Sequence, residues 1–127
     1  MKNGAHVLIV SRDEMLLRTR EMLLGSFFSV QGAGRANDAK DLIARTHFEL
    51  IVLCHSLSSD ECGQLAALAQ DQYPRPKILA MNATGVNPSN SWADMQLGVD
   101  EGPYGLIKKC AEMLDYTMES KAKAAHV

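Results

Sequence analysis

Short apolar runs that alternate with helix-forming segments are the feature that most limits how this chain can fold. The first run, HVLIV at residues 6–10, is continuous and rich in β-branched residues, which is typical of a strand covered on both faces. Similar runs recur at residues 27–33, 48–54 and 77–81 and, more briefly, near Val99. Strands separated by helices predict a parallel sheet with helices on both faces, joined by right-handed crossovers. We therefore expect a doubly wound α/β domain, a three-layer sandwich with a parallel five-stranded sheet.

Helix-start signals follow several of these runs. Ser11 lies three residues before Glu14, and Ser58 lies three residues before Glu61, which is the spacing of a capping box. Asn37 is the expected N-cap of the helix that lies between these two in the sequence. Each of these signals predicts a helix directly after a strand.

The first helix has apolar positions at helical spacing and is expected to end at a Gly25 cap. The residues expected to form its apolar face are Met15, Leu16, Thr19, Met22 and Leu23.

The second half of the chain gives weaker signals after residues 77–81. A polar loop rich in Gly, Asn and Pro leads to an expected short helix around Trp92–Leu97, and a brief strand is expected near Val99. A final helix is expected from about Tyr104 to Glu119. We therefore expect one domain over residues 1–120 and a polar tail over residues 121–127.

Composition excludes several classes of function. The chain has 127 residues, a formal net charge of -2 and 22% charged residues, so it fits one domain and lacks the broad basic field that direct nucleic-acid binding needs. Its N-terminal apolar run is too short for a signal peptide or a membrane span, which predicts a cytoplasmic protein with no membrane contact. The three cysteines match neither a disulfide framework nor a zinc pattern, and the four histidines have no metal-ligand spacing, so no metal or cofactor is expected.

Ligands of doubly wound sheets bind beyond the carboxyl ends of the strands, so the residues just after each strand are the candidate site. These residues are Ser11 and Arg12 after the first strand, Cys54 and His55 after the third, Met81 and Asn82 after the fourth, and Gly102 and Pro103 after the fifth.

This serial order resembles the receiver domain of two-component response regulators, the CheY-like superfamily, over nearly the whole chain. The resemblance implies a flavodoxin-like topology with strand order 2-1-3-4-5. It places Ser11 and Arg12 where a receiver has an acidic pair, and Cys54 where it has the phospho-accepting aspartate. Met81 or Asn82 stands at the position of a threonine or serine. Gly102 replaces a lysine, and Pro103 matches the cis proline that follows it.

The chemistry of phosphoryl transfer argues against a functional phosphorylation site. Transfer onto a side chain needs Mg²⁺, which prefers carboxylate and water oxygens. Ser11, Arg12 and Cys54 supply no carboxylate, and a guanidinium at Arg12 would repel a divalent ion. We expect a degenerate, atypical pseudo-receiver that neither binds Mg²⁺ tightly nor accepts a phosphoryl group.

The C-terminal third offers a candidate interaction surface, made of aromatic and methionine residues that are favoured at protein interfaces. Its residues are Trp92, Met95, Tyr104 and Met113. By resemblance, the face of the fourth helix, fifth strand and fifth helix is where receivers dimerise or meet targets. A protein partner or a homodimer through this face is therefore expected, although core packing also explains such residues.

These points lead to a pseudo-receiver signalling module in bacterial signal transduction or regulation, which is not an enzyme and acts by phosphorylation-independent protein–protein interaction. The alternative is a thiol-based redox sensor or small enzyme using Cys54, since a neighbouring imidazolium at His55 can lower a thiol's pKa. A buried, unreactive Cys54 at the end of a core strand is the plainer interpretation. A flavodoxin-like nucleotide binder ranks last, because the first loop lacks a phosphate cradle.

Overall fold

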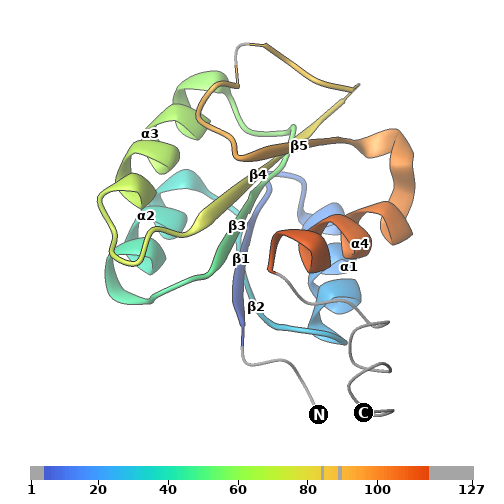
Figure 1. The fold of residues 1–127 in the computed structure, drawn as a ribbon, viewed down its shortest axis with the longest axis horizontal. Coiled ribbons are helices and arrows are strands. Elements are labelled where there is room, and N and C mark those ends of the chain that lie inside the picture. Colours follow the sequence, from blue (N-terminus) through green and yellow to red (C-terminus); the bar gives the residue numbers. More distant parts are fainter. Residues whose placement is uncertain (1–4, 84, 89, 115–127) are drawn as a thin grey trace.

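The computed structural model describes residues 5–83, 85–88 and 90–114, and within them strands and helices alternate along the chain (Figure 1). The elements are β1 (His6–Val10), α1 (Glu14–Gly25), β2 (Ser29–Ala33), α2 (Ala36–Arg45), β3 (Leu50–Leu53), α3 (Ser59–Gln70), β4 (Lys77–Asn82), β5 (Met95–Gly98), the 3₁₀ turn η1 (Val99–Glu101) and α4 (Gly102–Met113). The five strands are all parallel, in the order β2-β1-β3-β4-β5. The doubly wound α/β fold and its strand order are confirmed.

Helices cover both faces of the sheet and create two cores. Helices α1 and α4 lie on one face, and α2 and α3 lie on the other (Figure 1). Successive residues of the central strands point to opposite faces, so Val7 and Ile9 of β1 join the α1/α4 core while Leu8 and Val10 join the α2/α3 core. This two-sided burial explains why the central strands read as continuous apolar runs.

Helix starts agree only in part with the sequence signals. The capping box at the start of α3 is confirmed, because the Ser58 hydroxyl accepts from the Glu61 N–H and the Glu61 carboxylate accepts from the Ser58 N–H. The capping box expected at Ser11 is wrong, since Asp13 caps α1 by accepting from the Leu16 N–H.

The start of α2 also differs from the prediction. The expected cap Asn37 lies inside the helix, which begins at Ala36 after Arg35 at the N-cap position. No side chain caps the first turn of this helix in the described residues.

The apolar face of α1 was assigned in the wrong phase. Its buried residues are Leu17, Arg20 and Leu24, whereas Met15 and Met22 are exposed to 78% and 77%. The buried face was not recognised from the sequence because it contains Arg20, and a charged residue is rarely found at a core position.

The expected helix at Trp92–Leu97 is wrong, because β5 occupies Met95–Gly98 and Val99 lies in the turn after it. Asp94 fixes this strand. Its N–H donates to the carbonyl of Ile78 (2.9 Å), and its carboxylate accepts from the N–H of Ile78 (2.7 Å), which holds the chain beside β4. Hydrogen bonds to a strand this far away in the sequence cannot be predicted from the local spacing of apolar residues.

The last helix, α4, begins two residues earlier than expected, at Gly102, and is described to Met113. The expected continuation over residues 115–119, and the tail over residues 121–127, lie outside the described residues. At its carboxyl end the Lys77 ammonium donates to the Met113 carbonyl, a favourable position for a cation.

Candidate functional site

The carboxyl ends of β1 and β3 bring Ser11 and Cys54 side by side. Val10 pairs with Leu53 across the two strands, and the Cys54 N–H donates to the Val10 carbonyl (3.0 Å). On the other side, the Ser11 N–H donates to the Ala33 carbonyl (3.1 Å), so the first residue after β1 is still held by the sheet. The structure therefore brings together the first two positions of the expected receiver-like site.

Two hydroxyl groups meet at this edge of the sheet, Ser11 from the turn after β1 and Ser56 from the turn after β3. The Ser11 and Ser56 hydroxyl oxygens lie 3.2 Å apart, and Ser56 also accepts from the Arg12 N–H (2.9 Å). Ser11 accepts in turn from the Asp13 N–H (3.2 Å). These neutral hydrogen bonds tie the turn after β1 to the turn after β3, and they bring no carboxylate into the site.

Arg12 turns toward the start of α3 and makes the rim cationic. Its guanidinium lies 3.7 Å from the Glu61 carboxylate, and 60% of its side chain is exposed, so this ion pair is a weak surface contact. The backbone hydrogen bond from Ser58, and then the charge of Arg12, lower the pKa of Glu61. Arg12 and Arg35 also border a hollow of about 500 Å³ beside the first turn of α2.

Below the rim, the Arg20 side chain reaches Cys54 from α1. Arg20 is only 8% exposed, and its Nη1 atom has no hydrogen-bond partner among the described residues. Cys54 is 1% exposed, and burial raises the pKa of its thiol despite the opposing effects of the Arg20 guanidinium and the Ser11 hydroxyl. The carboxyl end of β3 thus holds a protonated thiol beside a buried cation.

Sequence reasoning missed Arg20, although a signal for it existed. Leu17 and Leu24 are seven residues apart, and Arg20 lies between them on the same helical face. A charged residue between two core positions of a site-lining helix could have been singled out on that spacing.

The other cysteines are also poor nucleophiles. Burial raises the pKa of Cys62 to about 11 and that of Cys110 to about 12. All three thiols are free and buried. Because the thiolate is the reactive form, none of them has the environment of an activated cysteine.

Met81 shares the α1/α4 core with Cys54, and both residues line one pocket together with Asn82, whereas Gly102 and Pro103 are not among its lining residues. Met81 is buried in the α1/α4 core, while Asn82 points to the other face of the sheet. Gly102 and Pro103 form the first turn of α4, where proline is well suited to start a helix, and the cis peptide bond among the described residues is Tyr73–Pro74. Gly102 adopts a positive φ of 74°, a conformation that favours glycine.

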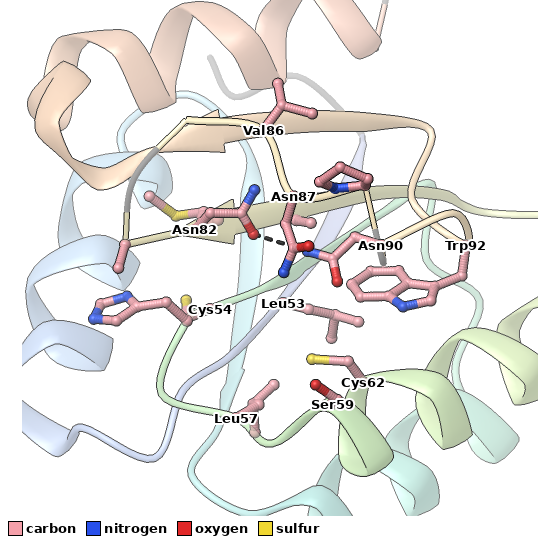
Figure 2. Close-up of a pocket in the computed structure, with 15 residues that line it drawn as sticks. Leu53, Cys54, Leu57, Ser59, Cys62, Asn82, Val86, Asn87, Asn90 and Trp92 are labelled. Atoms are coloured by element: carbon pink, nitrogen blue, oxygen red, sulfur yellow. Dashed lines mark hydrogen bonds between the residues drawn. The ribbon is translucent and has the colours of Figure 1, made fainter.

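A pocket of about 400 Å³ opens on the α3 face of the sheet, and we call it the loop pocket (Figure 2). It is bordered by the carboxyl ends of β3 and β4, the start of α3 and the loop between β4 and β5. Figure 2 shows the side chains of Asn82 and Asn90 in hydrogen-bond contact, with the Trp92 ring projecting from the loop on the side of α3. The loop thus covers this part of the sheet in place of the expected helix.

Amide side chains hold the loop in position. The Asn82 amide donates to the Gly85 carbonyl (2.8 Å) and to the Gln96 side-chain oxygen (2.7 Å), and it accepts from the Asn90 amide (2.8 Å). Gln96 also exchanges hydrogen bonds with the Asn87 backbone (2.8 and 3.1 Å). These contacts satisfy loop backbone groups that a helix would otherwise pair internally.

The four residues of the expected interaction surface do not share one exposed face. Trp92 lines the loop pocket, and Met113 is 4% exposed in the α1/α4 core. Met95 and Tyr104 are exposed, to 39% and 73%. The expected interaction face consisted of the fourth helix, the fifth strand and the fifth helix. Among the described residues, β5 and the last helix, α4, are present, and no helix lies between β4 and β5.

Two wider features of the described residues bear on function. No group of three or more His, Cys, Asp or Glu side chains is placed to hold a metal ion in this part of the chain. Across the same residues, no helix has the length and apolar character needed to cross a membrane.

Comparison with known proteins identifies the fold. No protein-family model and no curated protein sequence matches the chain. Among solved structures, it is similar to a response regulator receiver domain protein (CheY-like) from Methanospirillum hungatei, with 22% identity, a TM-score of 0.77, and coverage of 89% of this chain and 95% of that chain. It is also similar to the signal receiver domain of an HD domain-containing protein from Pseudomonas fluorescens (18% identity, TM-score 0.75, covering 89% and 96%). A third similar structure is the signal receiver domain of a putative Luxo repressor protein from Vibrio parahaemolyticus (16% identity, TM-score 0.76, covering 97% of this chain and 97% of that chain). The chain therefore has the flavodoxin-like fold of CheY-like response regulator receiver domains.

Proposed function

We propose that this chain is a receiver-fold signalling module that works by protein–protein contact and without phosphorylation. The observation that carries the proposal is the pair formed by Cys54 and Arg20 at the end of β3. Cys54, which the resemblance to receivers aligns with the phosphoryl acceptor, is a buried thiol, and a buried guanidinium lies against it. A phosphoryl acceptor would need an exposed oxygen nucleophile beside a magnesium ion.

The charge of the site supports the same proposal. Arg12 and Arg35 line its rim, Arg20 lies beneath it, and the hydroxyls of Ser11 and Ser56 stand between them. Mg²⁺ retains several waters and is held by one or two carboxylates in sites of this kind. The Glu61 carboxylate also borders the hollow beside α2, but it is paired with Arg12, so a divalent cation would meet two guanidinium groups against one carboxylate, which makes binding unfavourable.

Without a phosphoryl switch, output would depend on contact with a protein partner or with a second copy of the chain. Met95 on the edge strand β5 and Tyr104 in the first turn of α4 are exposed, and both belong to the face that we expect to bind this partner. Methionine and aromatic side chains are enriched at such interfaces. Bacterial signalling in the cytoplasm, with no catalytic activity, is the setting that we propose.

The decisive experiment is incubation with acetyl phosphate and Mg²⁺, followed by intact-mass analysis. We expect no phosphoryl adduct, and no rise in melting temperature with Mg²⁺ and beryllofluoride. A receiver domain with a complete acidic site serves as the positive control in the same run. An adduct, or stabilisation that depends on Mg²⁺, would refute the proposal.

The rival redox function is separated by alkylation. Folded protein is treated with iodoacetamide, and the modified cysteines are located by peptide mass spectrometry. Since burial raises the pKa of Cys54, we expect its labelling only after denaturation. Rapid labelling of Cys54 in the folded protein would favour the thiol-based alternative instead.

A further inference from the structure

The loop pocket has no carboxylate, ammonium or guanidinium group among the described residues of its lining, and His55 is its one imidazole. Fifteen residues line it, and none is Asp, Glu, Lys or Arg. Charged residues make up 22% of the chain, and 22% of 15 is about three, so their absence here is a departure from the chain's composition. An ion that entered would lose water without gaining a counter-charge, which is unfavourable. The pocket therefore suits an uncharged ligand.

Its size and position also fit a small molecule. A volume of about 400 Å³ falls within the range of roughly 300–1,000 Å³ that is typical of ligand pockets. It lies beyond the carboxyl ends of β3 and β4, the edge at which doubly wound sheets bind ligands. The Asn82–Asn90 hydrogen bond joins the loop to the end of β4 and holds this wall of the pocket in place (Figure 2).

The lining combines one aromatic ring with groups that can donate and accept hydrogen bonds. The Trp92 indole N–H and the Ser59 hydroxyl make no hydrogen bond to protein in the part of the chain that the structure describes, and the same holds for the Asn90 side-chain oxygen. An indole face stacks on a planar ring, and an asparagine amide can both donate to and accept from the edge of such a ring. These properties together match a flat heterocycle with hydrogen-bonding groups on its edge.

We propose that the loop pocket binds an uncharged nucleoside through its base, stacked on Trp92, and that it does not select the corresponding phosphorylated nucleotide. The lining offers no lysine or arginine for a phosphate group, which separates this site from ordinary nucleotide-binding loops. The proposal goes beyond signalling by protein contact and stands independently of it.

The chain carries its own reporter for this site, because Trp92 is its single tryptophan. Adenosine, guanosine, cytidine and uridine are titrated in turn while Trp92 fluorescence is recorded. We expect a saturable change with at least one of them, with a Kd below about 1 mM. The matching 5′-monophosphate should bind no more tightly than the nucleoside. No saturable change with any nucleoside, a monophosphate that binds about tenfold tighter, or equal binding of methyl glucoside would overturn the proposal.

A matched pair of variants locates the binding. Ser59→Phe places a ring in the pocket from an exposed position in the first turn of α3, and Asp60→Phe adds the same ring at the adjacent exposed position outside the lining. Loss of stacking is worth about 1–3 kcal/mol, so Ser59→Phe should weaken binding about fivefold or more while Asp60→Phe stays close to wild type. Far-UV circular dichroism checks that both variants fold. Wild-type affinity in a folded Ser59→Phe variant would overturn the assignment.

A second readout does not depend on either variant. In the ¹H–¹⁵N spectrum of the wild-type protein, the single indole N–H signal of Trp92 should shift on addition of the nucleoside, together with amides of residues that line the pocket. Shifts confined to residues elsewhere would overturn the proposal.

Discussion

The contact between Arg20 and Cys54 makes a quantitative prediction about charge in the protein interior. Arg20 is 8% exposed and Cys54 is 1% exposed, so an acid placed at position 54 is buried beside a buried cation. In the variant Cys54→Asp, the new carboxylate gains the Arg20 guanidinium as its partner. We expect its stability to remain within about 2 kcal/mol of wild type, because the attraction offsets much of the desolvation of the acid.

The companion substitution removes the cation. In Arg20→Met, a side chain of similar length fills the space, and a buried guanidinium nitrogen without a partner is lost. An unsatisfied buried donor costs about 1–3 kcal/mol, so this variant should be more stable by up to that amount, or about 3–5 °C in melting temperature per kcal/mol. Arg18→Met is the matched control, because Arg18 is an exposed arginine on the same helix and its loss should change stability by less than about 0.5 kcal/mol.

Combining the two substitutions tests the geometry itself. With Arg20 replaced by methionine, an aspartate at position 54 has no counter-charge, and Cys54→Asp should then cost about 3–5 kcal/mol. Urea denaturation followed by far-UV circular dichroism at neutral pH gives the free energy of unfolding of wild type, the two single variants and the double variant. The comparison requires that the dependence of this free energy on urea concentration is the same for all four proteins. A coupling free energy below about 0.5 kcal/mol would refute the reasoning, because it would mean that the two side chains do not face each other.

Three further predictions concern the frame around the site. Ser58→Ala removes the cap of α3 and should lower the free energy of unfolding by about 1 kcal/mol in urea titration, with a loss below about 0.3 kcal/mol contradicting the capping role. Asp94→Ala leaves the Ile78 N–H without its side-chain acceptor and should cost about 1–3 kcal/mol, and hydrogen exchange of that amide should accelerate; an unchanged exchange rate would argue against the contact. Burial raises the pKa of Cys110 from 9.0 to about 12, so its contribution to stability is complete below pH 9 and falls as the pH rises above that value. Denaturation midpoints measured between about pH 8 and 11 should therefore decline less in Cys110→Ala than in wild type, and parallel declines would contradict this assignment.

The strands of this fold were readable from the sequence because their burial is two-sided. Val7 to Val10 are all inaccessible to solvent, so the central strands show no polar alternation. The capping box at Ser58 was readable for a similar reason, since both of its hydrogen bonds lie within four residues of the chain. Features of this kind can be predicted from the sequence because they depend on residues that are close together in it.

The expected helix near Trp92 failed because of contacts between residues far apart in the sequence. The Trp92–Leu97 segment has a helix-like pattern, but the bonds between Asp94 and Ile78 make it part of a sheet. Ser11 has the spacing of a cap, but Asp13 caps α1 instead, and the Ser11 hydroxyl contacts the Ser56 hydroxyl and the Asp13 backbone.

The candidate site shows the same division. The placement of Ser11 and Cys54 after adjacent strands followed from strand order, and the structure brings them together. The Arg20 contact could not be read in the same way, because it depends on the rotation of α1 against the sheet, which the misassigned apolar face had wrong. The order of the strands therefore predicted that the loops after β1 and β3 meet. The packing of α1 against the sheet, which the sequence did not predict, places the charge of Arg20 beneath these loops.

The amide contacts of Asn82, Gln96 and Asn90 set how the β4–β5 loop responds to its surroundings. These contacts join neutral groups, so added salt has no ion pair to screen in them, and protons do not titrate them near neutral pH. The loop should keep its shape from dilute buffer to high ionic strength. Binding at this edge of the sheet would then report the concentration of its ligand without interference from changes in the ionic content of the cell.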